Sequence, residues 1–375
     1  MLSKHQAFYI FVLLKCALAR SPVRCTIPVD QDVDKILEVI VQKKCTIVTF
    51  GDLTVPAGKK LDLRVLPQGI ELVFTGTIVF KCNPQNRHAL EYFVYIEGKN
   101  VHITGATGNK FDGSGACYWD KNNNDGKLNP KFFLFHLVDS HVEGLSVLNA
   151  PAHVFMISNS QNTIFNNINI DNQAGDGLAK NTDGFHVTQS TGIIIRDCYV
   201  HNQDDCFTAT SGSNITFTKS QCLGGNGASI GSIGQKRVND VSDVTISYIN
   251  ITDSLNGFRI KTIQGASGSV INIKVTDIVI NNIKDFGILI RQDYLDAKGN
   301  VPQRAATNGV EIRGLKISNF KGTVREKAQR VLVYCGDGSC SDWQWSNIQI
   351  TGGTAEGLAK CQNIPKDPKN GVKCQ

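Results

Sequence analysis

The chain has 375 residues, of which 41% are hydrophobic and 19% are charged, and its formal net charge is +6 at pH 7. This length fits two or three average domains, but large all-β solenoids and barrels also reach it as one unit. The basic excess is mild and scattered along the chain, which argues against a nucleic-acid-binding patch and is compatible with an anionic substrate.

Residues 1–19 are typical of a secretory signal peptide. Lys4 supplies a basic start, residues 7–14 form an apolar run, and Ala17-Leu18-Ala19 fits a small-residue cleavage site. A membrane anchor is the alternative, but the run is too short to span a bilayer and Lys15 interrupts it. No other long apolar run occurs in the sequence. We therefore expect a secreted protein without a membrane partner, whose net charge falls by two, from +6 to about +4, when both lysines are removed.

Twelve cysteines in a secreted chain indicate disulfide bonds. A zinc site is the alternative, but no Cys-x-x-Cys pair occurs. The spacing suggests four local bonds: Cys25–Cys45, Cys206–Cys222, Cys335–Cys340 and Cys361–Cys374. Cys16 lies in the signal segment, and three cysteines remain, of which we expect at least one to be a free, buried thiol: Cys82, Cys117 and Cys198. Asn214 and Asn250 begin sequons that can be glycosylated if they are exposed.

The N-terminal part of the mature chain contains the best helix candidate, within residues 26–44. Asp30–Asp34 offers a cap, and apolar residues recur at helical spacing: Val33, Ile36, Leu37, Ile40 and Val41. From about residue 46 the apolar period becomes two. This predicts strands at residues 47–50, 61–63, 70–74 and 78–80.

Beyond residue 100, short alternating segments recur, most of them followed by an Asn, Ser or Gly turn: residues 101–103, 164–170, 192–200, 215–217, 244–246, 271–273, 310–312 and 343–345. Their starts lie roughly 20 to 40 residues apart, as in solenoid repeats. A unit this short cannot bury its own apolar face, so the coils must stack on one another. We therefore predict one all-β domain over residues 20–375, a parallel β-helix whose open end is capped by the early helix. A sandwich or propeller is disfavoured because hairpin turn pairs and a fixed blade length are absent.

Polar residues are expected to gather in one groove of this β-helix. Successive coils stack about 4.8 Å apart, so equivalent positions line up along one face. Three carboxylates lie in two short polar segments between strand-like segments. An amide, two cations and a tyrosine follow on later coils. The groove is expected to collect Asp183, Asp204, Asp205, Asn226, Arg259, Lys261 and Tyr294.

These residue types point to cleavage of an acidic polysaccharide. Three neighbouring carboxylates repel one another, which raises at least one pKa and places a proton donor beside proton acceptors. Glycosidic bonds are cleaved by such a pair. Arg259 and Lys261 are two apart on a strand and can hold a substrate carboxylate. The alternatives are calcium binding by the acids, a solvated strand face for the two cations, and a packing role for Tyr294. Cys206 is a structural cysteine rather than a nucleophile.

At these residues the chain resembles polygalacturonases, the glycoside hydrolases that cleave pectin. Four segments resemble the signature motifs of that family, in the same order and spacing: Asn181-Thr182-Asp183-Gly184-Phe185, Gln203-Asp204-Asp205-Cys206, Gly225-Asn226-Gly227 and Arg259-Ile260-Lys261. The similarity continues at residues 129–133, 229–234 and 340–343. It covers essentially the whole mature chain and is greatest for the endo-acting type found in fungi and in plant-eating insects.

The resemblance implies a right-handed parallel β-helix and an inverting mechanism that needs no metal or other cofactor. Asp204 corresponds to the general acid, and Asp183 and Asp205 to the pair that activates the attacking water. Inversion would require about 6.5–9.5 Å between the acid and base carboxyl groups. His186 stands where plant-type members have His and fungal members usually have Asp. Four residues correspond to substrate-binding positions: Arg259, Lys261, Tyr294 and Asn181.

Asn226 is the main departure from the family pattern, which has His at this position. An asparagine can donate a hydrogen bond, but it cannot carry a proton charge or titrate near neutral pH. Loss of an acid–base contribution costs about 10²–10⁴ in rate. The sequence therefore predicts a polygalacturonase with reduced activity.

Two other functions are compatible with the sequence. A non-catalytic homologue would bind oligogalacturonate or act as a decoy for plant proteins that inhibit polygalacturonases. A pectate lyase would share the β-helix but would need calcium and would release unsaturated products. We expect a monomer, because an enzyme that binds along a long polymer needs an accessible groove; a dimer mass in sedimentation would contradict this.

Overall fold

The computed structural model describes residues 21–374 except 83–84, 86–88, 120–128, 235–236, 296–303, 354–358 and 366–370. The signal peptide expected at residues 1–19 lies outside the described residues and stays a prediction. No helix within the described ranges is long and apolar enough to cross a membrane.

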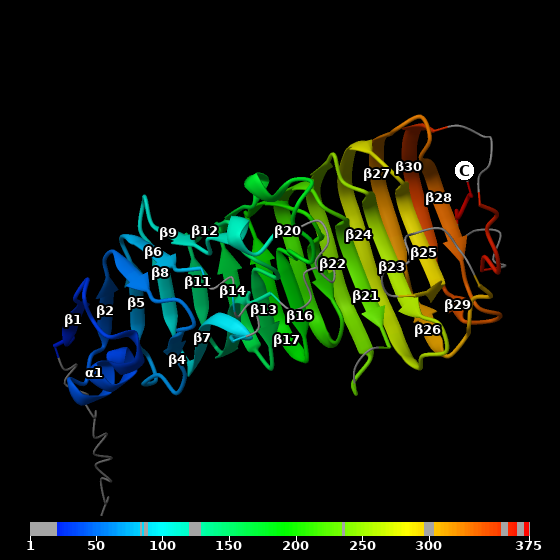
Figure 1. The fold of residues 1–375 in the computed structure, drawn as a ribbon. Helices are drawn as coiled ribbons and strands as arrows, with labels where there is room; N and C mark the ends of the chain where they lie inside the picture. The colour runs from blue at the N-terminus through cyan, green and yellow to red at the C-terminus, as the bar shows by residue number, and fades with distance from the viewer. Residues whose placement is uncertain are drawn as a thin grey trace, which may run out of the picture.

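The described chain winds into a solenoid of stacked parallel strands, which runs from β1 and α1 at one end to β28 and β30 at the other (Figure 1). Each strand pairs with its counterpart one coil further along the chain, and these pairings are parallel. The pairings divide the strands into three runs, here called sheets 1, 2 and 3. This architecture confirms the parallel β-helix expected from the repeats.

Sheets 1 and 2 are joined through three long strands that belong to both: β20 (Gly212–Gly224), β22 (Asp240–Thr252) and β24 (Gly268–Ile283). Sheet 1 also contains β1 (Arg24–Ile27), β2 (Ile47–Phe50), β5 (Glu71–Phe74), β8 (His102–Gly105), β11 (His141–Glu143), β14 (Gln161–Asn166), β17 (Ser190–Arg196), β26 (Val310–Arg313) and β29 (Cys340–Ser341). Sheet 2 also contains β3 (Leu53–Val55), β6 (Thr77–Phe80), β9 (Lys110–Asp112), β12 (Ser146–Leu148), β15 (Asn169–Asp171), β18 (Tyr199–Asn202), β27 (Lys316–Val324) and β30 (Gln344–Gly352).

Sheet 3 meets sheet 1 where Val138 pairs with Gln161. It contains β4 (Leu61–Leu63), β7 (Tyr92–Lys99), β10 (Lys131–Val138), β13 (Phe155–Ser158), β16 (Phe185–Thr188), β19 (Asp205–Ala209), β21 (Gly227–Ile233), β23 (Asn256–Ile263), β25 (Phe286–Tyr294) and β28 (Gln329–Tyr334). Short 3-10 turns lie between strands: η1 (Val33–Lys35), η2 (Gly115–Cys117) and η4 (Gln173–Gly175).

A column of phenylalanines fixes the register of sheet 3. Phe133, Phe155, Phe185 and Phe207 follow one another in register on successive coils, and all four are fully buried. Neighbouring rings are 5.1 Å and 5.2 Å apart for the first three. Each buried phenylalanine stabilises the fold by roughly 1.5–3 kcal/mol, and a one-residue slip would turn it out of the core. The residues just before these phenylalanines are therefore aligned with one another on successive coils.

The N-terminal helix lies within residues 26–44, as expected. The α-helix α1 covers Ile36–Gln42 and follows η1, so together they include the residues with helical apolar spacing. The β-branched Thr26 and Ile27, at the start of this range, pair with β2. The expected cap is present at η1, where Asp32 accepts a hydrogen bond from the amide of Asp34. Ile36 and Ile40 are fully buried at the N-terminal end of the solenoid (Figure 1), consistent with a capping role.

The cysteines are joined in the four pairs that the spacing suggests. A fifth disulfide joins Cys82 to Cys117. Within the described residues Cys198 is a free, buried thiol, and its sulfur donates a hydrogen bond to the carbonyl of Arg196. Asn214 and Asn250 are both exposed on long strands, as glycosylation requires.

A column of left-handed turn residues connects sheets 1 and 2. Its members occupy equivalent positions on successive coils and have φ between 50° and 57°: Asp197, Lys219, Tyr248, Asp277, Asn319 and Asn347. Asn and Asp tolerate this conformation because their short polar side chains bond locally, whereas bulky residues are strained in it. Tyr248 is the aromatic member, with φ 56° and 60% of its surface exposed.

We predict that Tyr248→Asn increases the free energy of unfolding by about 0.5–1 kcal/mol, because asparagine relieves the left-handed strain and no buried contact is lost. Urea unfolding monitored by fluorescence measures the change. Tyr248→Phe is the matched control and should leave the midpoint unchanged, since it keeps the aromatic side chain. An unchanged or lower midpoint for Tyr248→Asn would contradict the prediction.

Candidate active site

Sheet 3 brings the predicted site residues together. All eight line one cavity of about 340 Å³, here called the groove: Asn181, Asp183, Asp204, Asp205, Asn226, Arg259, Lys261 and Tyr294. They come from successive coils, at or just before β16, β19, β21, β23 and β25. The pairing of β19 with β21 shifts between Asp205 and Phe207, and such a bulge re-aims nearby side chains.

Asp205 lies at the centre of a buried ion-pair network. It is 2% exposed, and its Oδ1 accepts hydrogen bonds from Ser229 at 2.6 Å and from Arg259 Nη2 at 2.7 Å. Its Oδ2 accepts a hydrogen bond from Lys261 Nζ at 2.8 Å. Burial raises the pKa of Asp205, but Arg259 and Lys261 outweigh burial and hold the pKa below its ordinary value. This carboxylate is therefore ionised, and both its oxygens are occupied.

Asp204 has the opposite protonation preference. Burial, followed by the negative charges of Asp183 and Asp205, raises the pKa of Asp204 to about 7. Its Oδ1 accepts two hydrogen bonds at 2.8 Å, one from the backbone amide of Asp205 and one from the side-chain amide of Asn226. A protonated Asp204 therefore carries its hydrogen on Oδ2, because Oδ1 already faces two donors.

Asp183 lies between two histidines. Oδ1 is 3.7 Å from His153 Nε2, and Oδ2 is 3.4 Å from His186 Nδ1. Burial raises the pKa of Asp183, but the two histidines and Lys261 outweigh burial and lower it. Burial also lowers the pKa of His153 to about 4, so this ring is neutral above that pH. Asp183 is thus a second ionised carboxylate in the groove.

The three carboxylates lie close together. One oxygen from each of them lies within 4.8 Å of the others. The ion pairs of Asp205 with Arg259 and Lys261 offset part of the repulsion between these acids. A calcium ion would need free carboxylate oxygens, and Arg259, Lys261 and Ser229 occupy those of Asp205. The calcium alternative is therefore disfavoured.

Asn226 is held against the acid by its backbone as well as its side chain. Its amide nitrogen donates a hydrogen bond to the carbonyl oxygen of Asp204 at 2.8 Å. Its carbonyl oxygen accepts a hydrogen bond from the side chain of Asn256 at 3.3 Å. The position is therefore rigid, and the side chain orients the carboxyl group of Asp204.

Tyr294 packs beside two cations, Lys261 of the adjacent strand β23 and Arg291 of its own strand β25. Lys261 Nζ lies 5.5 Å from its ring centroid, and the Arg291 guanidinium lies 5.6 Å away. Arg291 is itself buried and bonded to Asp293 at 2.9 Å. Asn181 has a φ of 54° just before Asp183 and also lines the groove.

Several groove residues were missed by the sequence analysis as site candidates. His153 precedes β13 by the same interval as Asp183 precedes β16, so counting back one coil from Asp183 would have found it. Ser229 pairs in register with Arg259 and bonds to both Arg259 and Asp205. Lys131 and Met156 also line the groove. Lys131 lies in the family-like segment at residues 129–133, whereas no local pattern marks Met156.

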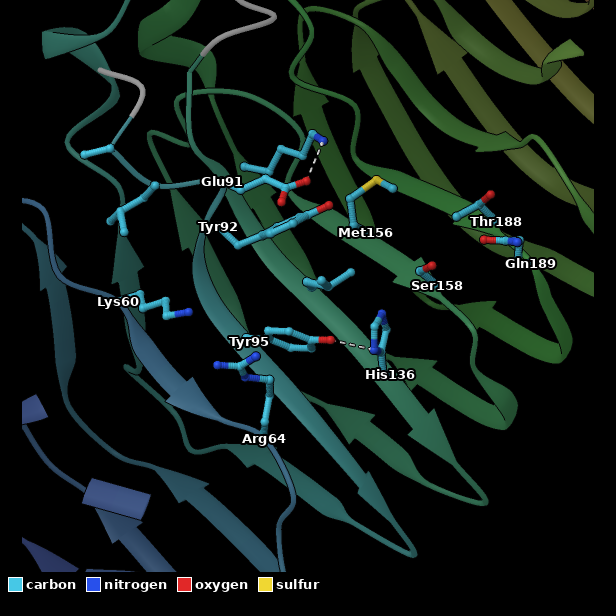
Figure 2. A pocket seen from close by; sticks show the side chains of 14 residues that line it. Lys60, Arg64, Glu91, Tyr92, Tyr95, His136, Met156, Ser158, Thr188 and Gln189 are labelled. Carbon is cyan, nitrogen blue, oxygen red and sulfur yellow. Dashed lines mark hydrogen bonds and ion pairs between the residues drawn. The ribbon is translucent and has the colours of Figure 1, made fainter. Parts of the chain in front are cut away.

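A second cavity of about 660 Å³ adjoins the groove and shares Lys131 and Met156 with it. It is here called the basic cavity, because its lining contains Lys60, Arg64 and Lys131 but one acid, Glu91. Figure 2 shows Arg64 beside Tyr95, whose ring centroid is 4.9 Å from the guanidinium, and the hydroxyl of Tyr95 directed at His136. Cations and aromatic rings together suit an anionic sugar.

Comparison with known proteins agrees with this chemistry. A family model described as glycosyl hydrolases family 28 matches residues 45–374. Endopolygalacturonase II of Aspergillus awamori is 41% identical over 324 residues, which cover 86% of this chain and 87% of the relative. Probable endopolygalacturonase A of Aspergillus parasiticus is 40% identical over 323 residues, 86% of each chain.

Solved structures share the fold. Endopolygalacturonase I from Stereum purpureum, complexed with two galacturonate, has a TM-score of 0.70 and 31% identity, and the match covers 83% of this chain and 91% of that one. Endo-xylogalacturonan hydrolase from Aspergillus tubingensis, at 21% identity, has a TM-score of 0.79 over 94% of this chain and 99% of that one, which supports the fold alone. The family model spans most of the chain, and the relatives match it nearly end to end. The chain therefore belongs to glycosyl hydrolases family 28 and is a glycoside hydrolase, as the motif resemblance indicates.

Proposed function

We propose that this glycoside hydrolase is a secreted polygalacturonase that hydrolyses pectin between 1,4-linked galacturonic acid units. The observation that carries the proposal is the contrast between Asp204, whose pKa is raised to about 7, and the ionised Asp183 and Asp205 beside it. A proton donor next to ionised carboxylates is what glycosidic cleavage requires. The relative from Stereum purpureum holds galacturonate, which supports the substrate class. The family assignment argues against a lyase.

In this proposal Asp204 protonates the leaving glycosidic oxygen through Oδ2. Asp183 is the better base of the remaining pair, because both oxygens of Asp205 accept hydrogen bonds from Arg259, Lys261 and Ser229. Asp205 then keeps Asp204 protonated and helps to orient the water. The two cations next to Asp205 attract the substrate carboxylate, and Tyr294 and Asn181 contact the sugar.

Inversion is the proposed stereochemical course. A retaining mechanism needs a carboxylate that attacks the sugar carbon, and Asp205 is a poor nucleophile because its oxygens are bonded to two cations and a hydroxyl. Because one oxygen of each carboxylate lies within 4.8 Å of the others, a single attacking water can donate hydrogen bonds to two of the acids at once. NMR of fresh digests distinguishes the two courses: a first product of opposite anomeric configuration to the substrate supports inversion, and the same configuration excludes it.

Reduced activity is proposed for this chain because of Asn226. Its bond to Asp204 Oδ1 at 2.8 Å keeps the acid oriented, so part of the motif histidine's role is retained. A neutral amide cannot exchange a proton with the acid or place a positive charge next to it. This favours a weak enzyme. The alternative, a non-catalytic homologue that binds oligogalacturonate or acts as a decoy for plant polygalacturonase inhibitors, is favoured only by this same substitution.

The basic cavity offers room for further sugar units of the polymer. It continues the groove past Lys131, and it contains Arg64 and Lys60, each of which is in an ion pair with Asp62. We therefore propose that long substrates extend from the groove into the basic cavity. Secretion is supported by the disulfide bonds, which persist in oxidising compartments.

Turnover of demethylated polygalacturonan tests the proposed function. The natural protein should release reducing ends slowly, Asp204→Asn should release none, and Asn226→His should be faster by about 10²-fold or more, the scale of an acid–base contribution. Asp176→Asn is the matched control, because it removes an exposed carboxylate outside the groove, and it should turn over normally.

No release by the natural protein, with oligogalacturonate still bound, would favour the decoy alternative. If Asn226→His were also inactive, the loss of activity would have a cause elsewhere in the groove.

The pH dependence follows from Asp204. Its pKa is raised, so the protonated, proton-donating form is present below about pH 7 and is lost as the pH rises through that value. Asp183 and Asp205 have lowered pKa values and stay ionised in mild acid. We predict that kcat/KM for an oligogalacturonate falls above about pH 7 and is maintained at mildly acidic pH, while fluorescence shows the protein to be folded throughout. A fall in kcat/KM that begins near the ordinary aspartate pKa of about 4 would be inconsistent with this assignment.

The basic cavity is tested by substrate length. Arg64→Ala should raise KM for polygalacturonan by up to about fivefold, because an exposed ion pair contributes about 0.2–1 kcal/mol. KM for a trimer, which is too short to reach the cavity, should not change. Lys110→Ala, at an exposed lysine outside both cavities, is the control. Equal effects of Arg64→Ala on long and short substrates would exclude a binding role for the cavity.

A further inference from the structure

Two histidines and a carboxylate converge at one side of the groove. His153, Asp183 and His186 each offer one ligand atom, and these atoms lie within 4.8 Å of one another. The two rings stack with centroids 5.4 Å apart. His153 Nε2 and His186 Nδ1 face different oxygens of Asp183, at 3.7 Å and 3.4 Å.

The spacing matches a tetrahedral metal site. Zinc binds imidazole nitrogen and carboxylate oxygen at about 2.0–2.2 Å, so two ligand atoms on a tetrahedron are about 3.3–3.6 Å apart. The two separations between the histidine nitrogens and Asp183 lie within a few tenths of an ångström of that range. Two histidines and one carboxylate are also the ligand set of known catalytic zinc sites.

The two nitrogens of His186 have different surroundings. Nε2 lies 3.2 Å from the hydroxyl oxygen of Thr210. Nδ1, which faces Asp183, is buried and has no close hydrogen-bond partner among the described residues. A buried ring nitrogen beside a carboxylate oxygen can share either a proton or a metal cation with it.

From this geometry we propose that His153, Asp183 and His186 form a binding site for a transition-metal dication such as Zn²⁺. The ligands are of the borderline type that zinc, copper and nickel prefer over calcium or magnesium. Asp204 and Asp205 lie next to Asp183, and the nearby Lys261 is paired with Asp205.

A metal at this site inhibits the hydrolase. Asp183 is the proposed base, and a carboxylate bound to Zn²⁺ no longer accepts a proton from the attacking water. This consequence rests on the proposed function, whereas the metal site itself does not. Catalysis needs no metal in this scheme; the cation acts as an inhibitor that competes for the base.

A second histidine pair supplies a matched control. On sheet 1, His102 and His141 stack with centroids 5.2 Å apart, and their Nε2 atoms lie 3.5 Å and 3.6 Å from Glu143. The His102 side chain is 49% exposed, against 19% and 14% for the side chains of His153 and His186. The same residue types are therefore present at a solvent-exposed position outside the groove.

Calorimetry with ZnCl₂ on EDTA-treated, dialysed protein at about pH 6.5 tests the site. We expect one high-affinity Zn²⁺ per chain, and at least a tenfold weaker Kd for His153→Gln and for His186→Asn, since even an outer-shell change costs 10–100-fold. His141→Gln should bind Zn²⁺ like the natural protein. Thermal unfolding of each variant without metal checks that it is folded. Unchanged Zn²⁺ affinity in both groove variants, or loss of binding in His141→Gln instead, would overturn the proposal.

The inhibition has its own readout. Zn²⁺ should inhibit release of reducing ends with a midpoint near the calorimetric Kd, and the midpoint should rise at least tenfold in His153→Gln. Because polyuronates also bind divalent cations, the proteins are compared at equal oligomer and metal concentrations. Zn²⁺ binding without any turnover would refute only the proposed hydrolase activity. Turnover without Zn²⁺ binding would refute only the metal site.

Discussion

The buried ion-pair network of Asp205 is the interaction on which the groove depends. A carboxylate that is 2% exposed would be strongly destabilising without compensation, and Arg259, Lys261 and Ser229 provide it. The same bonds fix the positions of β19, β21 and β23 relative to one another. Because removing one partner would leave a buried charge unpaired, the network both positions the site and makes its residues interdependent.

The fixed charge of Asp205 separates the roles of the acids. A second ionised carboxylate, Asp183, is stabilised on the other side by histidines. Asp204 lies next to both and has no ion pair with a cation among the described residues. It is therefore the group that keeps a proton, with a pKa of about 7. The three aspartates thus acquire different functions from their surroundings. Asn226 acts within this arrangement by orienting Asp204 rather than by changing its charge.

Much of the fold was predictable because each coil of a solenoid is specified by residues that are close together in the sequence. Alternating segments such as residues 215–217 and 244–246 lie in strands of sheets 1 and 2, where one face is buried and the other meets solvent. Sheet 3 near the groove was harder to predict. In β13, β19, β23 and β25 nearly every side chain is buried, so the polar–apolar alternation is lost. The N-terminal helix was also predictable, because the helical spacing of the apolar residues from Val33 to Val41 is a local property of the chain.

The sequence by itself determined the family, the stacking of coils and the identity of the eight groove residues, because motif order and coil period are both properties of the linear chain. Only the tertiary structure decided the role of each of these residues in the groove. Arg259 and Lys261 lie close enough to Asp205 to pair with it, His153 reaches Asp183 from the preceding coil, and the basic cavity continues past Lys131. Charges, pKa values and ligand geometry depend on distances across coils, and those distances follow from the register of buried columns such as Phe155, Phe185 and Phe207.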